Sequence, residues 1–396
     1  MVIFEGNKML RKIKSILFDL LFVVSKFFPK NKNLWLFGAW QGKLYGDNSK
    51  YLFRYINKIH PEIKSIWISQ NEEAVNKARL EGFKAFNKRA LAAKWYSLRA
   101  AVVFETEGNN DHIAYLIGGA KKIQLWHGFG IKNNKKWMND PKKFNKYKFQ
   151  TLSYAHNDDY WMTACDEASK KYMDSYNLSE DRMFITGQPK DDTFVWKKPN
   201  ETIDKIRVEH PGCRIFVYLP THRNFGRTGD INPIMSIDAL KQVNEKLRDT
   251  NIVMIFKPHF HEFAKYEGYT DSFSNIIFAT DKDKYGDVYE FLPVCDGLVT
   301  DYSGIMFGYL ASGKPIIYFT YDYDEYLKDD FGFYYNFDDI TYGPVCRTWD
   351  EVVNNMKNIT SEDYSSQREK LREKFCPYAD GNSCERVYLK VKELLN

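Results

Sequence analysis

The chain has 396 residues, too many for one hydrophobic core, and 44% of them are apolar and 16% aromatic. This length and composition predict two or three globular domains and exclude a disordered chain. The net charge of +5 is modest, so the distribution of the charges is more informative than their sum. The six cysteines form no Cys-x-x-Cys pair, which favours reduced thiols in a cytosolic protein over a disulfide framework or a zinc ribbon.

Residues 8–32 form a strongly basic segment in which Asp19 is the only acid. Its apolar residues, mainly within 16–28, recur at helical spacing and predict an amphipathic helix. The apolar run is shorter than the roughly 20 residues that span a bilayer, and it lacks the small-residue cleavage site of a secretion signal. Two interpretations remain open: a helix that lies in the membrane interface with its lysines near anionic headgroups, or an ordinary helix that packs on the first domain.

From residue 33 onward, short apolar strands alternate with helices, which predicts parallel α/β sheets covered on both faces. The expected strands of a first series and then of a second are 34–40, 64–69, 100–106, 121–128 and 183–189, followed by 213–223, 251–259, 275–280, 297–304 and 314–320. We therefore expect two Rossmann-like domains that face a cleft. The predicted division is a membrane-associating helix over 1–32, an N-terminal domain over 33–196 and a C-terminal domain over 203–396.

Charged and hydroxyl side chains gather where four of these strands end. In open parallel sheets, ligands bind beyond the carboxyl ends of the strands. The residues at these four ends are His127 and Gly128; Thr221, His222 and Arg223; Lys257, His259 and His261; and Thr300, Asp301, Ser303 and Gly304. Four of the eight histidines of the chain lie at such ends, and this joint occurrence indicates a site more strongly than any one residue does.

These residue types suggest that the site binds an anion. Arg223 offers a planar fork for phosphate oxygens and Lys257 a point charge. Ser303 and Gly304 open a predicted helix, whose free N–H groups favour an anion. The pattern predicts a nucleotide diphosphate held by separate strand ends. The alternatives are that Asp301 and Ser303 only cap the helix, and that single histidines are structural.

A metal site and a nucleic-acid site are both disfavoured by the sequence. His259 and His261 have the spacing of a metal pair, but no Cys, Asp or Glu nearby completes a ligand set, so we expect no metal and no cofactor. Lysines follow His127 closely, among them Lys132, Lys135 and Lys136, and aromatic residues lie between them. No nucleic-acid motif accompanies them, which leaves a membrane-facing surface that guides an acceptor or a solvated loop.

Several blocks of the chain resemble the CDP-glycerol glycerophosphotransferase family, whose members prime or polymerise teichoic acids and related polyol-phosphate capsules. The strongest are "QLWHGFGIK" (124–132), "YLPTHR" (218–223), "FKPHFHE" (256–262) and "LVTDYSGIMFGYLASGKPIIYFTYDYDEY" (298–326). The segments 37–56 and 332–345 are also similar, so the resemblance covers about 37–345 in the family order.

This resemblance implies a GT-B-type fold and a peripheral enzyme on the cytoplasmic face of the membrane. It implies metal-free transfer of a polyol phosphate from CDP-glycerol or CDP-ribitol, with release of CMP, to a hydroxyl of an acceptor linked to undecaprenyl pyrophosphate or another lipid. The family's catalytic histidines correspond to His127 and His259. Its donor-phosphate residues correspond to Arg223 and to the turn from Thr300 to Ser303. Thr221, Lys257 and Gly304 complete the expected donor site.

The chain departs from the family pattern at three positions beside these residues. Phe129 and Gly130 replace the usual Thr-Pro after His127-Gly128, Phe260 replaces a proline, and Gly304 replaces a second serine. No titrating group is lost. We expect His127 to be the general base, with a pKa that nearby lysines lower. The alternative functions are a UDP-sugar-dependent glycosyltransferase or epimerase, which shares the fold class, and a non-catalytic membrane scaffold.

Overall fold

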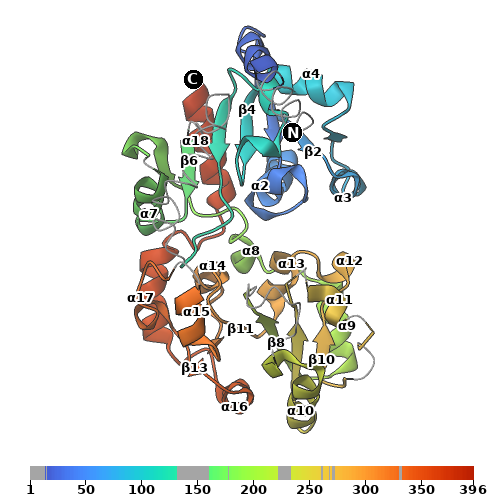
Figure 1. Cartoon of the computed structure of the whole chain (residues 1–396), viewed down its shortest axis with the longest axis vertical. Coiled ribbons are helices and arrows are strands. Elements are labelled where there is room, and N and C mark those ends of the chain that lie inside the picture. Colours follow the sequence, from blue (N-terminus) through green and yellow to red (C-terminus); the bar gives the residue numbers. More distant parts are fainter. Residues whose placement is uncertain are drawn as a thin grey trace, which may run out of the picture. The chain divides into compact units, whose positions relative to one another are not determined.

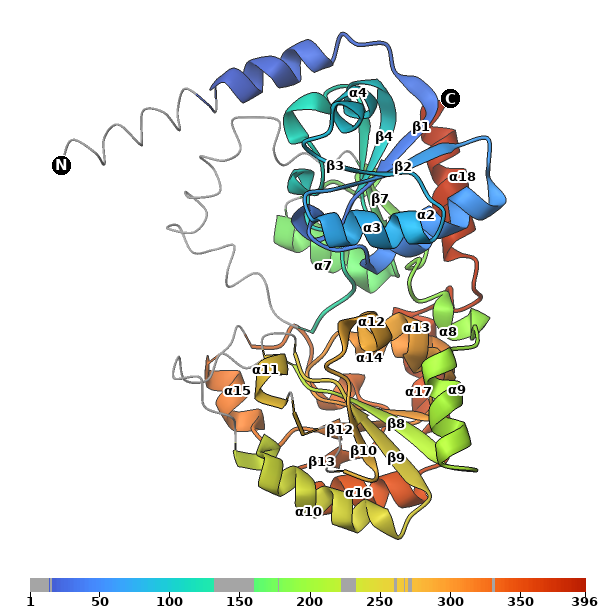
Figure 2. The same ribbon diagram turned by 90° about the vertical axis from the view of Figure 1, so that its right-hand side faces the viewer.

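The structure is a computed structural model that describes residues 14, 16–131, 160–176, 178–221, 233–259, 262–266, 268–269, 273–329 and 332–396. The chain forms two α/β units, each with its own parallel sheet (Figures 1 and 2). The first unit comprises Met1–His127, Lys135–Lys190 and Asn382–Asn396. The second comprises Gly128–Asn134 and Asp191–Gly381. The predicted class of two Rossmann-like sheets is confirmed.

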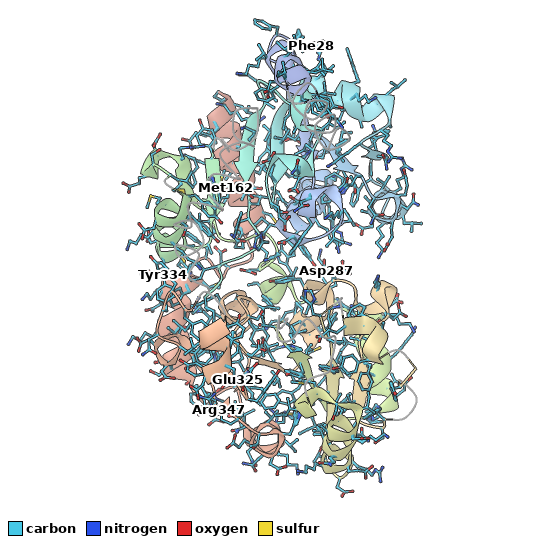
Figure 3. All side chains as sticks on the ribbon, in the orientation of Figure 1. Phe28, Met162, Asp287, Glu325, Tyr334 and Arg347 are labelled. Atoms are coloured by element: carbon cyan, nitrogen blue, oxygen red, sulfur yellow. The ribbon has the colours of Figure 1, made fainter. Side chains whose placement is uncertain are left out.

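The sheet of the first unit has the strand order β3-β2-β1-β4-β5-β6-β7 among the described residues, and every pair is parallel. The strands are β1 (Asn31–Phe37), β2 (Lys64–Ser69), β3 (Ala85–Asn87), β4 (Ala100–Glu105), β5 (Lys121–Gln124), β6 (Tyr160–Thr163) and β7 (Met183–Ile185). Helices α2 (Asp47–Ile59), α3 (Glu72–Leu80), α4 (Leu91–Arg99) and α7 (Asp166–Tyr176) connect them. Met162 of β6, labelled in Figure 3, is buried.

The alternating side chains of these strands bury two different faces. Leu34, Leu36 and Val103 belong to an aliphatic cluster that also contains Ala93 of α4. The opposite face is aromatic. There Phe37 stacks on Phe104 at 4.6 Å between ring centroids and meets Phe53 of α2 at 5.2 Å. Continuous burial on both faces is why these strands contain runs of apolar residues, and it allowed their prediction from sequence.

The sheet of the second unit has the order β10-β9-β8-β11-β12-β13 among the described residues, again all parallel. Its strands are β8 (Arg214–Leu219), β9 (Ile252–Phe256), β10 (Ile276–Phe278), β11 (Gly297–Thr300), β12 (Ile316–Phe319) and β13 (Val345–Cys346). The helices are α8 (Thr193–Trp196), α9 (Glu201–Glu209), α10 (Ile237–Arg248), α11 (Phe263–Tyr266), α12 (Lys282–Tyr285), α13 (Val288–Phe291), α14 (Ile305–Tyr309), α15 (Tyr323–Asp329), α16 (Trp349–Asn358) and α17 (Ser365–Phe375). Helices α10 and α16 bury their apolar residues against one face of this sheet.

The C-terminal helix α18 (Ser383–Leu395) belongs to the first unit, which differs from the predicted domain of 203–396. Its Val387 and Val391 are fully buried. Tyr388 packs 5.7 Å from Trp35 of β1 and donates its hydroxyl to Glu62 at 2.8 Å. The contacts that hold α18 therefore join residues more than 300 positions apart. Local sequence patterns do not predict contacts of this kind.

Residues 16–25 are helical, and they pack on the first unit through one side. Phe18 stacks on Tyr115 at 4.3 Å. The backbone N–H of Gly118 donates to Ser25 Oγ at 2.9 Å, and a Cβ at Gly118 would collide with the helix backbone at Phe22. The opposite side is exposed, with Leu20 at 59% and Phe27, just beyond the helix, at 82%. The predicted amphipathic helix over 1–32 remains a prediction, because residues 1–13 and 15 lie outside the described part.

None of the described helices has the length and apolar character required to cross a bilayer. All six cysteines are buried with free thiols.

Candidate active site

Both sheets reverse their direction of winding at one pair of strands, and the described site residues follow strands of these pairs or strands next to them. The order turns between β1 and β4 in the first unit and between β8 and β11 in the second. Such a switch point opens a crevice at the carboxyl ends of the strands, where α/β proteins bind ligands. His127 follows β5, next to β4, whereas Thr221 follows β8 and Asp301 follows β11.

In the first unit, the buried carboxylate of Asp111 joins the ends of β1 and β4. Its Oδ1 accepts the backbone N–H of Gln41 at 2.5 Å, and its Oδ2 accepts those of Thr106 at 2.6 Å and Glu107 at 3.2 Å. Burial raises the pKa of Asp111 to about 6, although these hydrogen bonds and Lys88 oppose the increase. Three backbone donors on one carboxylate fix both loops at the switch point.

One of these loops has an unusual backbone. Trp40, Gln41 and Gly42 all have positive φ, at 51°, 58° and 72°. Left-handed conformations cost free energy in residues other than glycine and persist only where the surroundings hold them. Here the hydrogen bond from Gln41 to Asp111 and a bond from the Trp40 N–H to Thr106 Oγ1 at 3.1 Å hold the turn. The turn presents the indole of Trp40 to His127.

The imidazole of His127 lies next to two tryptophan rings. Its centroid is 4.4 Å from that of Trp126, which is nearly parallel, and 5.6 Å from that of Trp40. The backbone carbonyl of Thr106 hydrogen-bonds to the ring, whereas no group in the described residues bonds to Nδ1, which is buried. In the neutral form one ring nitrogen carries the proton and the other a lone pair, and Nδ1 is the one that has no hydrogen-bond partner among the described residues.

The electrostatic surroundings keep this ring neutral. Burial is the largest effect and lowers the pKa of His127; the Asp47 carboxylate raises it, and the Lys190 ammonium lowers it. The predicted direction of the pKa shift is thus present. Burial is its largest cause, and among the described residues the cation that lowers this pKa is Lys190. The predicted effect of the lysines that follow His127 remains a prediction. Lys132, Lys135 and Lys136 lie outside the described residues.

Two residues at the start of α2 bring together the segments around His127. Asp47 Oδ2 accepts from Trp40 Nε1 at 2.9 Å, and its Oδ1 forms an ion pair with Lys190 Nζ at 3.2 Å. The amide of Asn48 donates to the carbonyl of Trp126 at 2.9 Å and accepts from the backbone N–H of Lys190 at 3.1 Å. The sequence analysis did not identify Asp47, Asn48 or Lys190 as site residues.

The second unit has the same arrangement around a buried aspartate. Asp301 accepts the backbone N–H of Thr221 at 3.0 Å and the Thr221 hydroxyl at 2.5 Å, and it also accepts the N–H of Tyr302 at 2.6 Å. The Thr300 hydroxyl donates to the carbonyl of Leu219 at 2.8 Å. Asp301 and Thr300 are both fully buried. In this structure these predicted donor-binding side chains join the ends of β8 and β11, and their contact with a donor remains a prediction.

Lys257 and His259 follow β9, beside this switch point. Lys257 Nζ donates to the carbonyl of Tyr285 at 2.6 Å and lies 5.3 Å from the centre of the Phe263 ring. Burial lowers the pKa of Lys257 to about 8, while Asp287, labelled in Figure 3, raises it. His259 is partly buried, and its backbone carbonyl accepts from Glu262 at 2.7 Å. Arg223, His222 and His261 lie outside the described residues.

The turn after β11 is shaped by a close contact with the segment that follows His127. A Cβ at Gly304 would lie 2.5 Å from the carbonyl oxygen of Phe129 and 3.2 Å from the Cα of Gly130. The Phe129 ring packs 4.7 Å from Phe307, and Tyr334 (Figure 3) donates to the carbonyl of Ile131 at 2.7 Å. Two departures from the family pattern, at 129–130 and at 304, are therefore in direct contact, and the glycine makes room for the segment.

The helix that begins after Ser303 is short. Helix α14 contains only five residues before a 3₁₀ turn, and Ser303 Oγ accepts from Ile305 at a long 3.4 Å. So short a helix has a small dipole, which weakens the predicted contribution of its N-terminus to phosphate binding. No cluster of three or more His, Cys, Asp or Glu that could hold a metal occurs in the described part of the chain.

Comparison with known proteins identifies relatives over nearly the whole chain. The sequence profile of the family described as CDP-glycerol:poly(glycerophosphate) glycerophosphotransferase matches residues 20–393. A teichoic acid glycerol-phosphate transferase of Staphylococcus aureus is 25% identical over 397 residues, with 95% of this chain and 97% of that protein covered. A teichoic acid poly(glycerol phosphate) polymerase of Bacillus subtilis is 26% identical over 96% of this chain, which spans only about half (51%) of that polymerase.

Solved structures agree on the fold. The wall teichoic acid polymerase TagF superposes with a TM-score of 0.76 at 22% identity, covering 100% of this chain and 99% of that one. A putative UDP-N-acetylglucosamine 2-epimerase from Listeria monocytogenes has a TM-score of 0.54 at 12% identity over 92% of this chain and 96% of its own. The expected GT-B-like class is thus shared with sugar-nucleotide enzymes, and fold alone does not separate the two functions.

The contact at Gly304 predicts a local loss of stability on substitution. Gly304→Ala should lower the free energy of unfolding of the second unit by about 1–3 kcal/mol, the usual cost of overpacking, because the carbonyl of Phe129 is backbone and cannot rotate away. The matched control is Gly130→Ala, since nothing lies within 4 Å of a Cβ there. Denaturant unfolding would measure both variants. Equal stability of the two would contradict the close contact.

Proposed function

The chain belongs to the CDP-glycerol:poly(glycerophosphate) glycerophosphotransferase family, and on this premise we propose that it transfers glycerol phosphate or another polyol phosphate from a CDP-activated donor to a hydroxyl of a lipid-linked acceptor in teichoic acid or capsule synthesis. Family membership makes it a transferase of this type. The identity of the polyol, the acceptor and the release of CMP are the proposed parts. One relative named a ribitol-phosphate primase and others named ribitol-phosphate polymerases are the reason to include CDP-ribitol as a donor.

The proposed reaction is a single displacement at phosphorus. The acceptor hydroxyl oxygen attacks the β-phosphorus of the CDP-polyol, the bond from that phosphorus to the bridging oxygen breaks, and CMP leaves with the electron pair. The hydroxyl proton passes to a base on the protein. Positioning and charge stabilisation supply most of the rate in phosphoryl transfer, and the chain's own side chains perform both tasks in this proposal.

His127 is the proposed base, and its geometry is the observation that carries the proposal. Its ring is held by the Thr106 carbonyl and two tryptophans, Nδ1 has no partner among the described residues, and its pKa is lowered. A neutral imidazole with a free lone pair can accept a proton as the new bond forms. Because Nδ1 is covered, the acceptor must displace the groups that cover it.

The donor is proposed to bind at the switch point of the second unit. Lys257 supplies positive charge and Ser303 a hydroxyl group. Thr221, whose N–H and hydroxyl both donate to Asp301 in this structure, is proposed to line the site at the end of β8. Arg223 and His259 complete the proposed set, with His259 as the second catalytic histidine that stabilises charge on the departing CMP. Thr300 and Asp301 hold the ends of β8 and β11 together, and Gly304 leaves room for the backbone of Phe129. Structures of TagF variants soaked with CDPG support a CDP-polyol as the ligand class.

The lipid-linked acceptor requires a membrane-facing surface, which we propose to lie at residues 16–27. Exposed Leu20, Val24 and Phe27 would enter the headgroup region of the cytoplasmic leaflet. Lys14 and Lys26 are exposed in or beside this segment and would attract anionic lipids, each by about 1 kcal/mol. Lys132, Lys135 and Lys136 are proposed to guide the acceptor towards His127. The enzyme would then be peripheral to the membrane.

Ligand-induced stabilisation tests the donor without any acceptor. CDP-glycerol or CDP-ribitol at a hundred times its Kd should stabilise the fold by about 2.7 kcal/mol, whereas UDP and UDP-N-acetylglucosamine should have little effect. Thermal unfolding with each compound, and with CDP and CMP alone, is the measurement. Preferential stabilisation by the uridine compounds would overturn the proposal in favour of a sugar-nucleotide enzyme. The absence of a shift with every nucleotide would favour a scaffold.

Vesicle binding tests the membrane-facing surface. The chain should co-sediment with vesicles that contain anionic lipid, and the double variant Leu20→Asp/Val24→Asp should bind several-fold less, because two carboxylates would have to enter the headgroup region. Leu80→Asp is the matched control, since Leu80 of α3 is 87% exposed and lies on another helix. If the double variant binds vesicles as well as the wild type and the control, this surface does not face the membrane.

A further inference from the structure

The buried ion pair between Asp47 and Lys190 contacts His127 from two directions. Lys190 Nζ donates to the backbone carbonyl of His127 at 2.5 Å, and it lies 3.2 Å from Asp47 Oδ1. Asp47 Oδ2 accepts from the indole of Trp40, whose ring lies 5.6 Å from that of His127. Both side chains of the pair are almost inaccessible, at 7% for Asp47 and 5% for Lys190. One ion pair thus holds the main chain of His127 and a ring beside its imidazole.

Burying such an ion pair costs free energy, so a contribution to stability alone does not explain why the pair is present. Removing two charges from water often outweighs their attraction, and replacement of a buried pair by apolar residues can even stabilise a protein. This pair also requires Asp47 at φ 60°, a left-handed conformation that residues other than glycine avoid. Strained, buried and charged groups of this kind cluster at functional sites.

We propose that Asp47 and Lys190 are positioning residues for the base of the transfer reaction: Lys190 anchors the His127 carbonyl, Asp47 anchors Trp40 and Lys190, and their opposite charges balance each other at the imidazole. This inference rests on the proposed function for its catalytic meaning. Its structural content, which is the control of His127 by this pair, can be measured without any substrate.

The charges that act on His127 determine the direction of each expected effect. Among the described residues these are Asp47 on α2, Lys190 after β7 and Glu107 after β4. Asp47 raises the pKa of His127 and Lys190 lowers it. Loss of the carboxylate should therefore lower the pKa, and loss of the ammonium should raise it. Loss of both should leave it near the wild-type value, and Glu107 is present in every variant.

Nuclear magnetic resonance titration of the His127 ring is the direct test, with His127→Gln to assign the signal. Asp47→Asn should move the titration to lower pH and Lys190→Met to higher pH, each by about one unit, and Lys190→Arg should leave it nearly in place. Lys171→Met is the control, because Lys171 is equally buried in the same unit but does not act on His127. Shifts in the same direction, or no shifts, would overturn the inference whatever the activity.

The pH dependence of CMP release connects the pair to catalysis. Since the base must be neutral, the acid limb of kcat/KM should follow the measured pKa in each variant, to lower pH for Asp47→Asn and to higher pH for Lys190→Met. A merely structural role would lower activity at all pH values without moving the limb. If wild-type protein releases no CMP while the magnetic resonance shifts still occur, the proposed function fails and the control of His127 by the pair stands.

The double variant Asp47→Asn/Lys190→Met keeps the test valid if a single variant does not fold, since it leaves no charge of this pair buried. Its acid limb should lie near the wild-type position. Its kcat should fall by about tenfold or more, because methionine cannot hold the His127 carbonyl and small misplacements of a reacting group are costly. The KM for the donor should stay unchanged. Unchanged kcat in a folded double variant would overturn the positioning role.

Discussion

One buried aspartate in each unit, Asp111 in the first and Asp301 in the second, holds the two strand ends between which the sheet reverses its winding. Each carboxylate accepts backbone N–H groups from both sides of the crevice. Without such an acceptor, these donors would be left unsatisfied where the crevice is least accessible to water, and the loops would lose their fixed geometry. The rest of the proposed chemistry depends on this constraint, because the crevice at the switch point is where a parallel sheet can present side chains to a ligand.

The two switch points are built by the same principle but carry different chemical groups. The first has an imidazole beside two tryptophan rings, and the ammonium of a buried ion pair donates to the backbone carbonyl of the same histidine. The second contains hydroxyl groups, backbone donors and a lysine whose pKa is lowered to about 8. A base for an acceptor hydroxyl suits the first set, and a binding site for a diphosphate suits the second. This division of tasks is what the proposed transfer from a CDP-polyol requires of the chain.

The sequence was sufficient to predict much of this arrangement. Because both faces of each sheet are buried, the strands contain continuous apolar runs. These runs located His127, Lys257 and Asp301 at strand ends. Asp47 and Lys190 could not be found in the same way, because they meet across 143 positions and their local surroundings look like an ordinary helix start and an ordinary turn. The placement of α18 in the first unit was missed for the same reason. The contact of Gly304 with the backbone carbonyl of Phe129 gives a reason for the glycine at 304, a departure from the family pattern that the sequence alone did not explain.

The central claim is that His127 is the base of a polyol-phosphate transfer from a CDP-activated donor. The most direct measurement is CMP release from CDP-glycerol, with a lipid-linked acceptor present and absent, by the wild type and by His127→Gln, together with calorimetric binding of CDP-glycerol to both. The wild type should release CMP only when the acceptor is present. The variant should lose about a hundredfold or more of this activity and should bind the donor with an affinity within a few-fold of wild type. Undiminished turnover in His127→Gln would contradict this claim, as would a wild type that releases no CMP from any CDP-polyol.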